Sequence, residues 1–337
     1  IKGVVYNEMK GAYSDPDRYL DSAVNTALFT DSPYRFESGG DPDKIPELTY
    51  EAFIDFYKKY YHPSNSYIYL YGKMDIDERM EYLDREYLSG YDKQVFNNEI
   101  KHQKDQNAVI RKNEYYPVVT GTGRDGMYAA GFITGDSCDE ENSLACSVLS
   151  YILMDTNASP IRKALTEGGF CDYAEGWYDP SMLDTVFTIA AKSAKENAGD
   201  EFESIVTKGL SDCVKNGLDK DLVRSAVNAF DFMLSEEDFG YKPRGLYYGL
   251  KAMNIWLHKD EPFESFKFKK YISIIREKAE NGLFEKLIEE KMLNNPTKVF
   301  VSLQPKEGMQ AESDAEEKER LEKYKNGLSE EKKEKPA

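Results

Sequence analysis

Histidine is scarce in this sequence, with only His62, His102 and His258 among 337 residues. No two of them are three or four positions apart, so a self-contained histidine zinc site is not expected. Cysteine is also sparse: four residues occur without a Cys-x-x-Cys pair, which favours a reducing, intracellular setting over disulfides. The Gly-x-Ser-x-Gly nucleophile elbow is absent, and no Gly-x-Gly-x-x-Gly motif follows a predicted strand, which argues against a dinucleotide-binding fold.

Long apolar runs and an excess of positive charge are missing as well. No run approaches the ~18–20 residues that cross a bilayer, and none resembles a signal-peptide core, so no membrane association is expected. The 61 acidic residues outnumber the 44 basic ones, giving a net charge of -17. Because nucleic-acid binding needs a basic surface, we expect no nucleic-acid partner. The hydrophobic content of 40% is that of a folded chain.

Apolar periodicity and capping residues predict helices that far outnumber the strands. Thr49 is a plausible N-cap, and Asp15 with Pro16 marks another helix start. The helices are expected over 3–13, from 16 to about 28, from 50 to about 61, and over 75–92, 139–154, 160–165, 196–216, 219–234, 243–257 and 267–292. Runs of β-forming residues predict strands over 67–71, 128–134, 185–191 and 298–303. This order favours an α+β fold, with helices packed on one face of a mostly antiparallel sheet.

The length suits about two domains, and two stretches of low apolar density divide the chain. Residues 94–113 are predicted to be a linker between a first unit, 1–93, and a second unit, 114–306. Residues 307–337 are strongly charged and predict a solvated helix or tail.

Glu8 is a carboxylate on a largely apolar helix face, between Asn7 and Met9. Such a group must reach a cation, a metal or water, because burying it unpaired is costly. From the residues alone, an exposed helix position and a ligand position both remain open.

The run from Lys2 to Pro16 (Lys-Gly-Val-Val-Tyr-Asn-Glu-Met-Lys-Gly-Ala-Tyr-Ser-Asp-Pro) resembles the pitrilysin/insulinase metallopeptidases, at the segment that carries their third zinc ligand. The presequence-protease branch is most similar. Further blocks agree in order along the chain: 38–42, 45–49 and 56–65, then 158–165 (Ala-Ser-Pro-Ile-Arg-Lys-Ala-Leu).

The resemblance implies that Glu8 is a ligand of Zn²⁺. The family's other two ligands and its general base belong to a His-x-x-Glu-His motif, which this sequence does not contain. His62 lies in a His-Pro turn that the family shares, so a structural role is expected. The chain is therefore expected to be an internal fragment that is inactive by itself.

The resemblance also implies which part of the family's fold each predicted unit forms. Residues 1–93 would be the later half of the first, zinc-bearing domain, 94–113 the interdomain linker, and 114–306 a complete second pitrilysin-like domain. Residues 307–337 would begin the helical hairpin that joins the two halves of these enzymes, so the remaining half of the same polypeptide is an expected partner.

The implied activity is zinc-dependent endopeptidase degradation of unstructured peptides inside a closed chamber. Six residues resemble a substrate-anchoring loop of relatives: Met154, Asp155, Thr156, Asn157, Ala158 and Ser159. The strand 185–191 is a neighbouring candidate, and an ordinary loop beside a core strand is the competing interpretation. Two other functions stay open, a non-catalytic pitrilysin-like binding or scaffold subunit and a stand-alone peptide-binding module. The expected location is the cytoplasm, or the mitochondrial matrix or a plastid if the source is eukaryotic.

Overall fold

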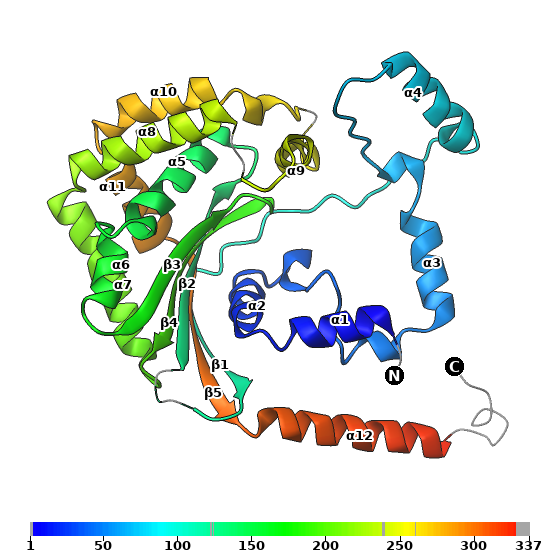
Figure 1. Cartoon of the computed structure of the whole chain (residues 1–337), viewed down its shortest axis with the longest axis horizontal. Helices are drawn as coiled ribbons and strands as arrows, with labels where there is room; N and C mark the ends of the chain where they lie inside the picture. The colour runs from blue at the N-terminus through cyan, green and yellow to red at the C-terminus, as the bar shows by residue number, and fades with distance from the viewer. Residues whose placement is uncertain (1–2, 122, 124, 238–239, 260, 328–337) are drawn as a thin grey trace.

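A five-stranded sheet forms the centre of the protein in this computed structural model, which describes residues 3–327 except 122, 124, 238, 239 and 260 (Figure 1). The strand order is β1-β5-β2-β4-β3. β1 and β5 are parallel and the other neighbours antiparallel, so the expected α+β class with a mostly antiparallel sheet is confirmed. The strands are β1 (Ala108–Val118), β2 (Gly126–Asp136), β3 (Cys171–Asp179), β4 (Asp184–Ala194) and β5 (Thr297–Glu307).

Helices begin largely where the capping residues predict. The Asp15 side chain accepts a hydrogen bond from Asp17 N at 3.0 Å, and Thr49 accepts one from Ala52 N at 3.2 Å. The predicted helix 267–292 is interrupted by Gly282, whose φ of 80° breaks the helical path. The helices are α1 (Val4–Ala12), α2 (Pro16–Leu28), α3 (Tyr50–Tyr60), α4 (Ile76–Leu83), α5 (Glu140–Ser150), α6 (Pro160–Thr166), α7 (Gly199–Asn216), α8 (Lys220–Glu236), α9 (Arg244–Trp256), α10 (Phe268–Ala279), α11 (Leu283–Ile288) and α12 (Met309–Gly327).

The larger core lies between one face of the sheet and helices α5, α6, α7, α8, α10 and α11 (Figure 1). Its aromatic centre joins β2 to α7, because the rings of Tyr128 and Phe202 stack with centroids 5.5 Å apart. Phe170 packs against both rings, and all three side chains are fully buried. Burial of several such side chains stabilises the helix layer by roughly 1.5–3 kcal/mol each.

The opposite face of the sheet is covered by α2, so the expectation of helices on one face only is wrong. Helix α2 comes from the part of the sequence expected to form the first domain. Leu20, Val24 and Leu28 recur on one side of α2 and are buried against β2 and β5. A side chain on Gly131 of β2 would place its Cβ 2.7 Å from Val24 Cγ1, so glycine permits the close approach. The predicted unit 114–306 therefore lacks the helix that covers one face of its sheet. Residues 16–28 must be added to it.

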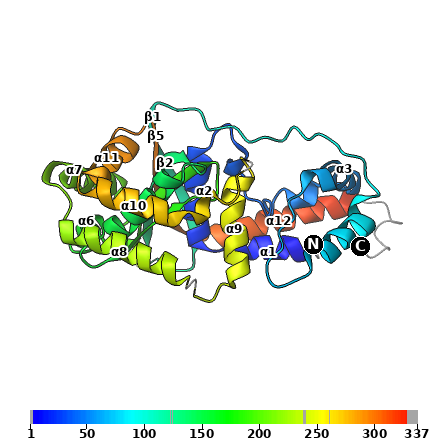
Figure 2. The ribbon, with the colours of Figure 1, turned by 90° about the horizontal axis from the view of Figure 1, so that it is seen from above.

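The predicted linker is too long at its C-terminal end. β1 begins at Ala108, so residues 108–113 pair with β5 instead of connecting two units. As an edge strand, β1 tolerates the charged and exposed residues that made this stretch look like a linker. Figure 2 shows the rest of the predicted linker, residues 94–107, crossing in extended form from the α3–α4 side of the molecule to β1.

The strand predicted over 67–71 is wrong, since these residues have no strand partner in the described structure. The alternating tyrosines instead pack on α9: Tyr67 lies 4.8 Å from Trp256 between ring centroids. β-forming residues alone do not make a strand when no neighbouring backbone is available to pair with.

A Gly-x-Gly-x-x-Gly pattern at 121–126 does follow a strand, because β1 extends to Val118. It leads directly into β2 and not into a helix. The helix N-terminus that would bind a pyrophosphate is therefore missing, and the pattern does not mark a dinucleotide site.

Candidate functional site

Glu8 lies on an exposed face of α1. Tyr6 and Met9 turn inward and are 6% and 7% exposed, whereas Glu8 is exposed together with Val4 and Val5. The Glu8 carboxylate makes no hydrogen bond or ion pair with the described residues. An apolar surface around an unpaired carboxylate is thus open to a further layer of protein or a ligand.

Helix α1 is fixed by α12, the charged helix predicted from 307–337, of which residues 328–337 lie outside the described structure. The Tyr6 hydroxyl donates a hydrogen bond to Glu317, and Lys10 Nζ lies 2.5 Å from the same carboxylate. These bonds lower the pKa of Glu317. Arg320 adds a contact to Asp43 at 3.6 Å. Tyr6 and Lys10 of α1 are therefore engaged by α12, and the Glu8 face is left free.

The described residues do not by themselves form a zinc site. No group of three or more histidine, cysteine, aspartate or glutamate side chains in this part of the chain is arranged to hold a metal ion. His62 accepts a hydrogen bond from Ser64 N at 3.1 Å, which confirms its expected structural role in the turn. His102 Nδ1 lies 2.7 Å from Asp184 Oδ1. The third histidine is His258, whose pKa is lowered by burial. Catalytic zinc needs three protein ligands, which the described residues do not bring together.

Of the six residues from Met154 to Ser159, Met154 and Asp155 end a π-helical turn, Tyr151–Asp155, and residues 156–159 form the turn that leads into α6. Met154 and Ser159 are fully buried, and the Ser159 hydroxyl donates to Tyr151 O at 3.3 Å and accepts from Thr156 N at 3.0 Å. The exposed members are Asp155, Asn157 and Ala158. Only these, with the half-buried Thr156, are accessible to a substrate.

The neighbouring candidate, 185–191, cannot receive an added peptide strand. It belongs to β4, which pairs with β2 on one side and β3 on the other. The edge of the sheet here is β3, a strand that the sequence analysis missed. β3 lies beside the predicted loop, since a Cβ on Gly176 would be 2.4 Å from Met154 Cγ.

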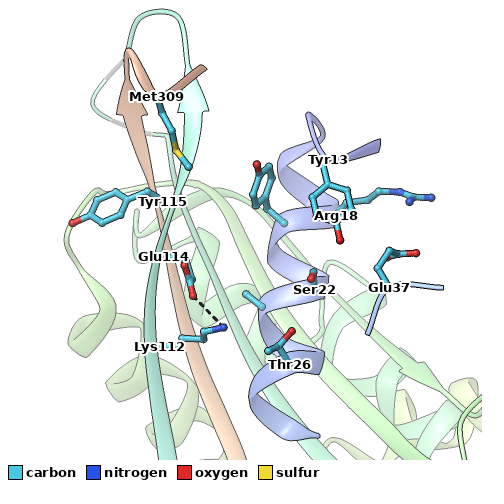
Figure 3. A pocket seen from close by; sticks show the side chains of 11 residues that line it. Tyr13, Arg18, Ser22, Thr26, Glu37, Lys112, Glu114, Tyr115 and Met309 are labelled. Atoms are coloured by element: carbon cyan, nitrogen blue, oxygen red, sulfur yellow. Dashed lines mark ion pairs between the residues drawn. The ribbon is translucent and has the colours of Figure 1, made fainter. Parts of the chain in front are cut away.

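A cavity of about 240 Å³ lies between α2, β1 and the start of α12 (Figure 3). Lys112 and Glu114 on β1 form an ion pair of 3.0 Å in its wall. From α2 come Arg18, Ser22 and Thr26, a polar stripe at four-residue spacing. The four-residue spacing is visible in the sequence, but β1, the strand that faces these residues, was not predicted. Neither Glu8 nor residues 154–159 line this cavity.

Comparison with known proteins decides the family. The family profile described as "Peptidase M16 inactive domain" matches residues 47–230, from before α3 into α8. The chain belongs to the peptidase M16 family. The resemblance to pitrilysin-type peptidases inferred from the segment around Glu8 is thereby confirmed.

Relatives with curated names match over nearly the whole chain. Protein HypA of Clostridium perfringens is 40% identical over 97% of the chain and 34% of its own length. Presequence protease 1 of Arabidopsis thaliana, named as chloroplastic/mitochondrial, is 34% identical over 98% of the chain and 31% of its own length. The chain thus spans about a third of the length of these relatives.

The fold is also that of solved M16 structures. A peptidase M16 inactive domain from Pseudomonas fluorescens superposes with a TM-score of 0.66 at 16% identity, covering 90% of this chain and 69% of that one. Among the described helices, none offers a stretch long and apolar enough for a bilayer crossing.

Proposed function

We propose that this M16 chain is part of a zinc-dependent endopeptidase that degrades unstructured peptides in a closed chamber. The observation that carries the proposal is the position of Glu8. It is unpaired and exposed on a helix whose other side is buried, and it falls in the block that resembles the family's metal-binding segment. Presequence proteases among the relatives support a peptidase.

Glu8 would supply one carboxylate ligand to Zn²⁺, and the remaining ligands would come from a longer polypeptide that carries this chain. Bound zinc in such enzymes acidifies a water molecule for attack on a peptide bond. The described residues contribute neither the other ligands nor the base, so the chain by itself is expected to be inactive. A longer polypeptide would also supply the half that closes the chamber.

Substrate peptides would pair with the free edge of β3. An extended peptide adding to a sheet edge gains backbone hydrogen bonds with little demand on sequence, which suits a general peptide-degrading enzyme. Residues Asp155, Thr156, Asn157 and Ala158, next to β3, would contact the end of the bound strand. A Kd on the order of 10–1000 μM corresponds to roughly 4–7 kcal/mol.

Backbone pairing can be tested with the 337-residue chain and one peptide in three forms. N-methylation at alternate residues removes the donors that face β3, whereas N-methylation at the intervening residues leaves them intact. We expect one methylated form to lose binding and the other to match the unmodified peptide. Equal binding by both methylated forms would exclude strand addition.

Catalysis is tested in a longer polypeptide that carries this chain. Glu8→Gln should abolish cleavage of an unstructured peptide, while the control Glu51→Gln, an exposed position on α3, should leave it unchanged. Full cleavage by the Glu8 variant would contradict the assignment. The competing function is that of a non-catalytic subunit, which the profile name "inactive domain" favours. It predicts peptide binding without cleavage by every variant.

The location proposed for the protein follows the relatives. A bacterial source such as that of HypA would place it in the cytoplasm, and a eukaryotic source would place it in the mitochondrial matrix or a plastid, as the name of the Arabidopsis relative states for that protein.

A further inference from the structure

A second cavity, of about 320 Å³, lies among α5, α8 and α9 on the helical side of the sheet. Its α8 wall is apolar and is formed by Phe230, Met233 and Leu234. Glu140, the first residue of α5, and Lys251 of α9 line the same cavity with opposite charges, and Lys242 adds a second cation to its wall. The volume falls at the small end of the range for ligand sites, which selects a small molecule over a long peptide.

Glu140 and Lys251 do not pair with each other. No ion pair joins them in the described structure, and the Glu140 carboxylate has no hydrogen-bond partner there. Lys251 Nζ lies 5.9 Å from the centre of the Phe266 ring, its one specific contact among the described residues. Both side chains therefore line one cavity without forming an ion pair with each other. Phe266 itself lines the adjacent cavity, which Lys251 also lines.

Partial burial makes both charges costly, since each side chain is half-buried. It raises the pKa of the Glu140 carboxyl to about 7 and lowers the pKa of the Lys251 ammonium. Removing an ionised group from water without a partner is strongly unfavourable, whereas a hydrogen-bonded partner of opposite charge offsets that cost. A ligand that brings an ammonium to Glu140 and a carboxylate to Lys251 would compensate both groups at once.

We propose that this cavity binds a small zwitterion, a free amino acid or a dipeptide, with its ammonium on Glu140 and its carboxylate on Lys251. The ligand's apolar side chain packs against Phe230, Met233 and Leu234 of α8. The amide of Asn254, which also lines the cavity, is placed to hydrogen-bond the ligand's polar groups. The site belongs to this chain alone and does not depend on zinc or on peptide cleavage.

The test is a titration of the 337-residue chain with the dipeptide Leu-Leu, followed by calorimetry and by amide NMR. We expect saturable binding with a Kd of about 1 mM or tighter and shifts at residues of α5 and α9. N-acetyl-Leu-Leu and Leu-Leu-amide, which each lack one charge, should bind at least about tenfold more weakly. Absence of saturable Leu-Leu binding up to about 10 mM would overturn the proposal.

Variants identify the two contacts. Glu140→Gln and Lys251→Met should each weaken Leu-Leu binding about tenfold or more. The matched controls are Glu141→Gln on α5 and Lys278→Met on α10. They make the same charge changes in an ion pair that does not line the cavity. Thermal unfolding confirms that each variant is folded before its titration. Unchanged affinity in folded Glu140 and Lys251 variants, or equal loss in the controls, would overturn the assignment.

Discussion

Gly245 of α9 lies directly beneath the ring of Tyr71: a Cβ on Gly245 would be 2.5 Å from Tyr71 Cδ1. One turn along the helix, Gly249 stands in the same relation to Tyr69, with a Cβ distance of 3.0 Å. The segment 67–71 therefore contacts α9 through two glycines at helical spacing. This contact connects the part of the chain that carries α3 and α4 to the helix layer of the sheet.

Gly245→Leu should separate the segment 67–71 from α9, because the new side chain occupies the space of the Tyr71 ring. Overpacking of this kind costs about 1–3 kcal/mol locally. Limited proteolysis should show faster cleavage within 61–75, and Trp256 fluorescence should change as Tyr67 moves away. The control is Gly11→Leu, a helical glycine whose Cβ would meet no atom within 4 Å. Equal cleavage rates in the two variants would contradict the contact.

Leu28→Ala should destabilise the whole sheet unit. Leu28 is fully buried between α2 and the sheet, and truncating such a leucine costs about 2–5 kcal/mol. Urea unfolding measures the loss, with Leu48→Ala, at a side chain that is 64% exposed, as the control expected to change stability by under about 0.5 kcal/mol. A small effect of Leu28→Ala would show that the sheet folds without α2.

Glu140→Gln should stabilise the protein at pH 8 and have little effect near pH 4. Burial raises the pKa of Glu140 from 4.5 to about 7, with Glu264 and Asp139 adding to the rise and Lys251 opposing it. The native state then holds its proton more tightly than the unfolded state, so stability falls as the pH rises through this window. We expect a gain of about 1–3 kcal/mol at pH 8, the helix N-terminus reducing the full value.

Urea unfolding at the two pH values measures this effect. The control Glu141→Gln, which loses an ion pair to Lys278, should lower stability slightly or leave it unchanged. A Glu140→Gln variant less stable than the parent at pH 8 would mean that the carboxylate has a partner in solution.

Glu317→Gln should loosen α12 from α1. Glu317 accepts from Tyr6 and pairs with Lys10, whereas Glu319 pairs only along its own helix, with Lys323 at 2.7 Å. Amide hydrogen exchange in α12 should quicken in the Glu317 variant and stay unchanged in Glu319→Gln. Identical exchange in both would mean that the interhelical contacts do not hold α12. The pair is exposed enough that its contribution is at most about 1 kcal/mol.

Local signals in the sequence predicted much of this fold. Asp15 and Thr49 cap the helices that they were expected to cap, and the strands around 128–134, 185–191 and 298–303 all form. β3 was missed because Asp172, Glu175 and Gly176 are weak strand formers, and an edge strand tolerates them. The packing of α2 across the sheet was missed because it joins segments far apart in the chain, which periodicity does not reveal.

The candidate sites also differ in how much of each could be predicted from the sequence. Glu8 and its segment could be singled out from the sequence through the family resemblance. The loop 154–159 was located, but its inward side chains, Met154 and Ser159, are visible only once α6 and β3 are in place. Glu140 and Lys251 line one cavity only because the fold brings parts of α5 and α9 to it, so no local pattern could have connected them.

Zinc content tests the central claim, that Glu8 is a metal ligand in a family member whose described residues cannot hold zinc alone. The measurement is metal analysis of two proteins after dialysis, the 337-residue chain and a longer polypeptide that carries it. We expect no stoichiometric zinc on the chain, about one zinc per longer polypeptide, and loss of that zinc in Glu8→Gln but not in Glu51→Gln. One zinc bound tightly by the 337-residue chain, or full zinc occupancy in the longer Glu8→Gln variant, would contradict the account.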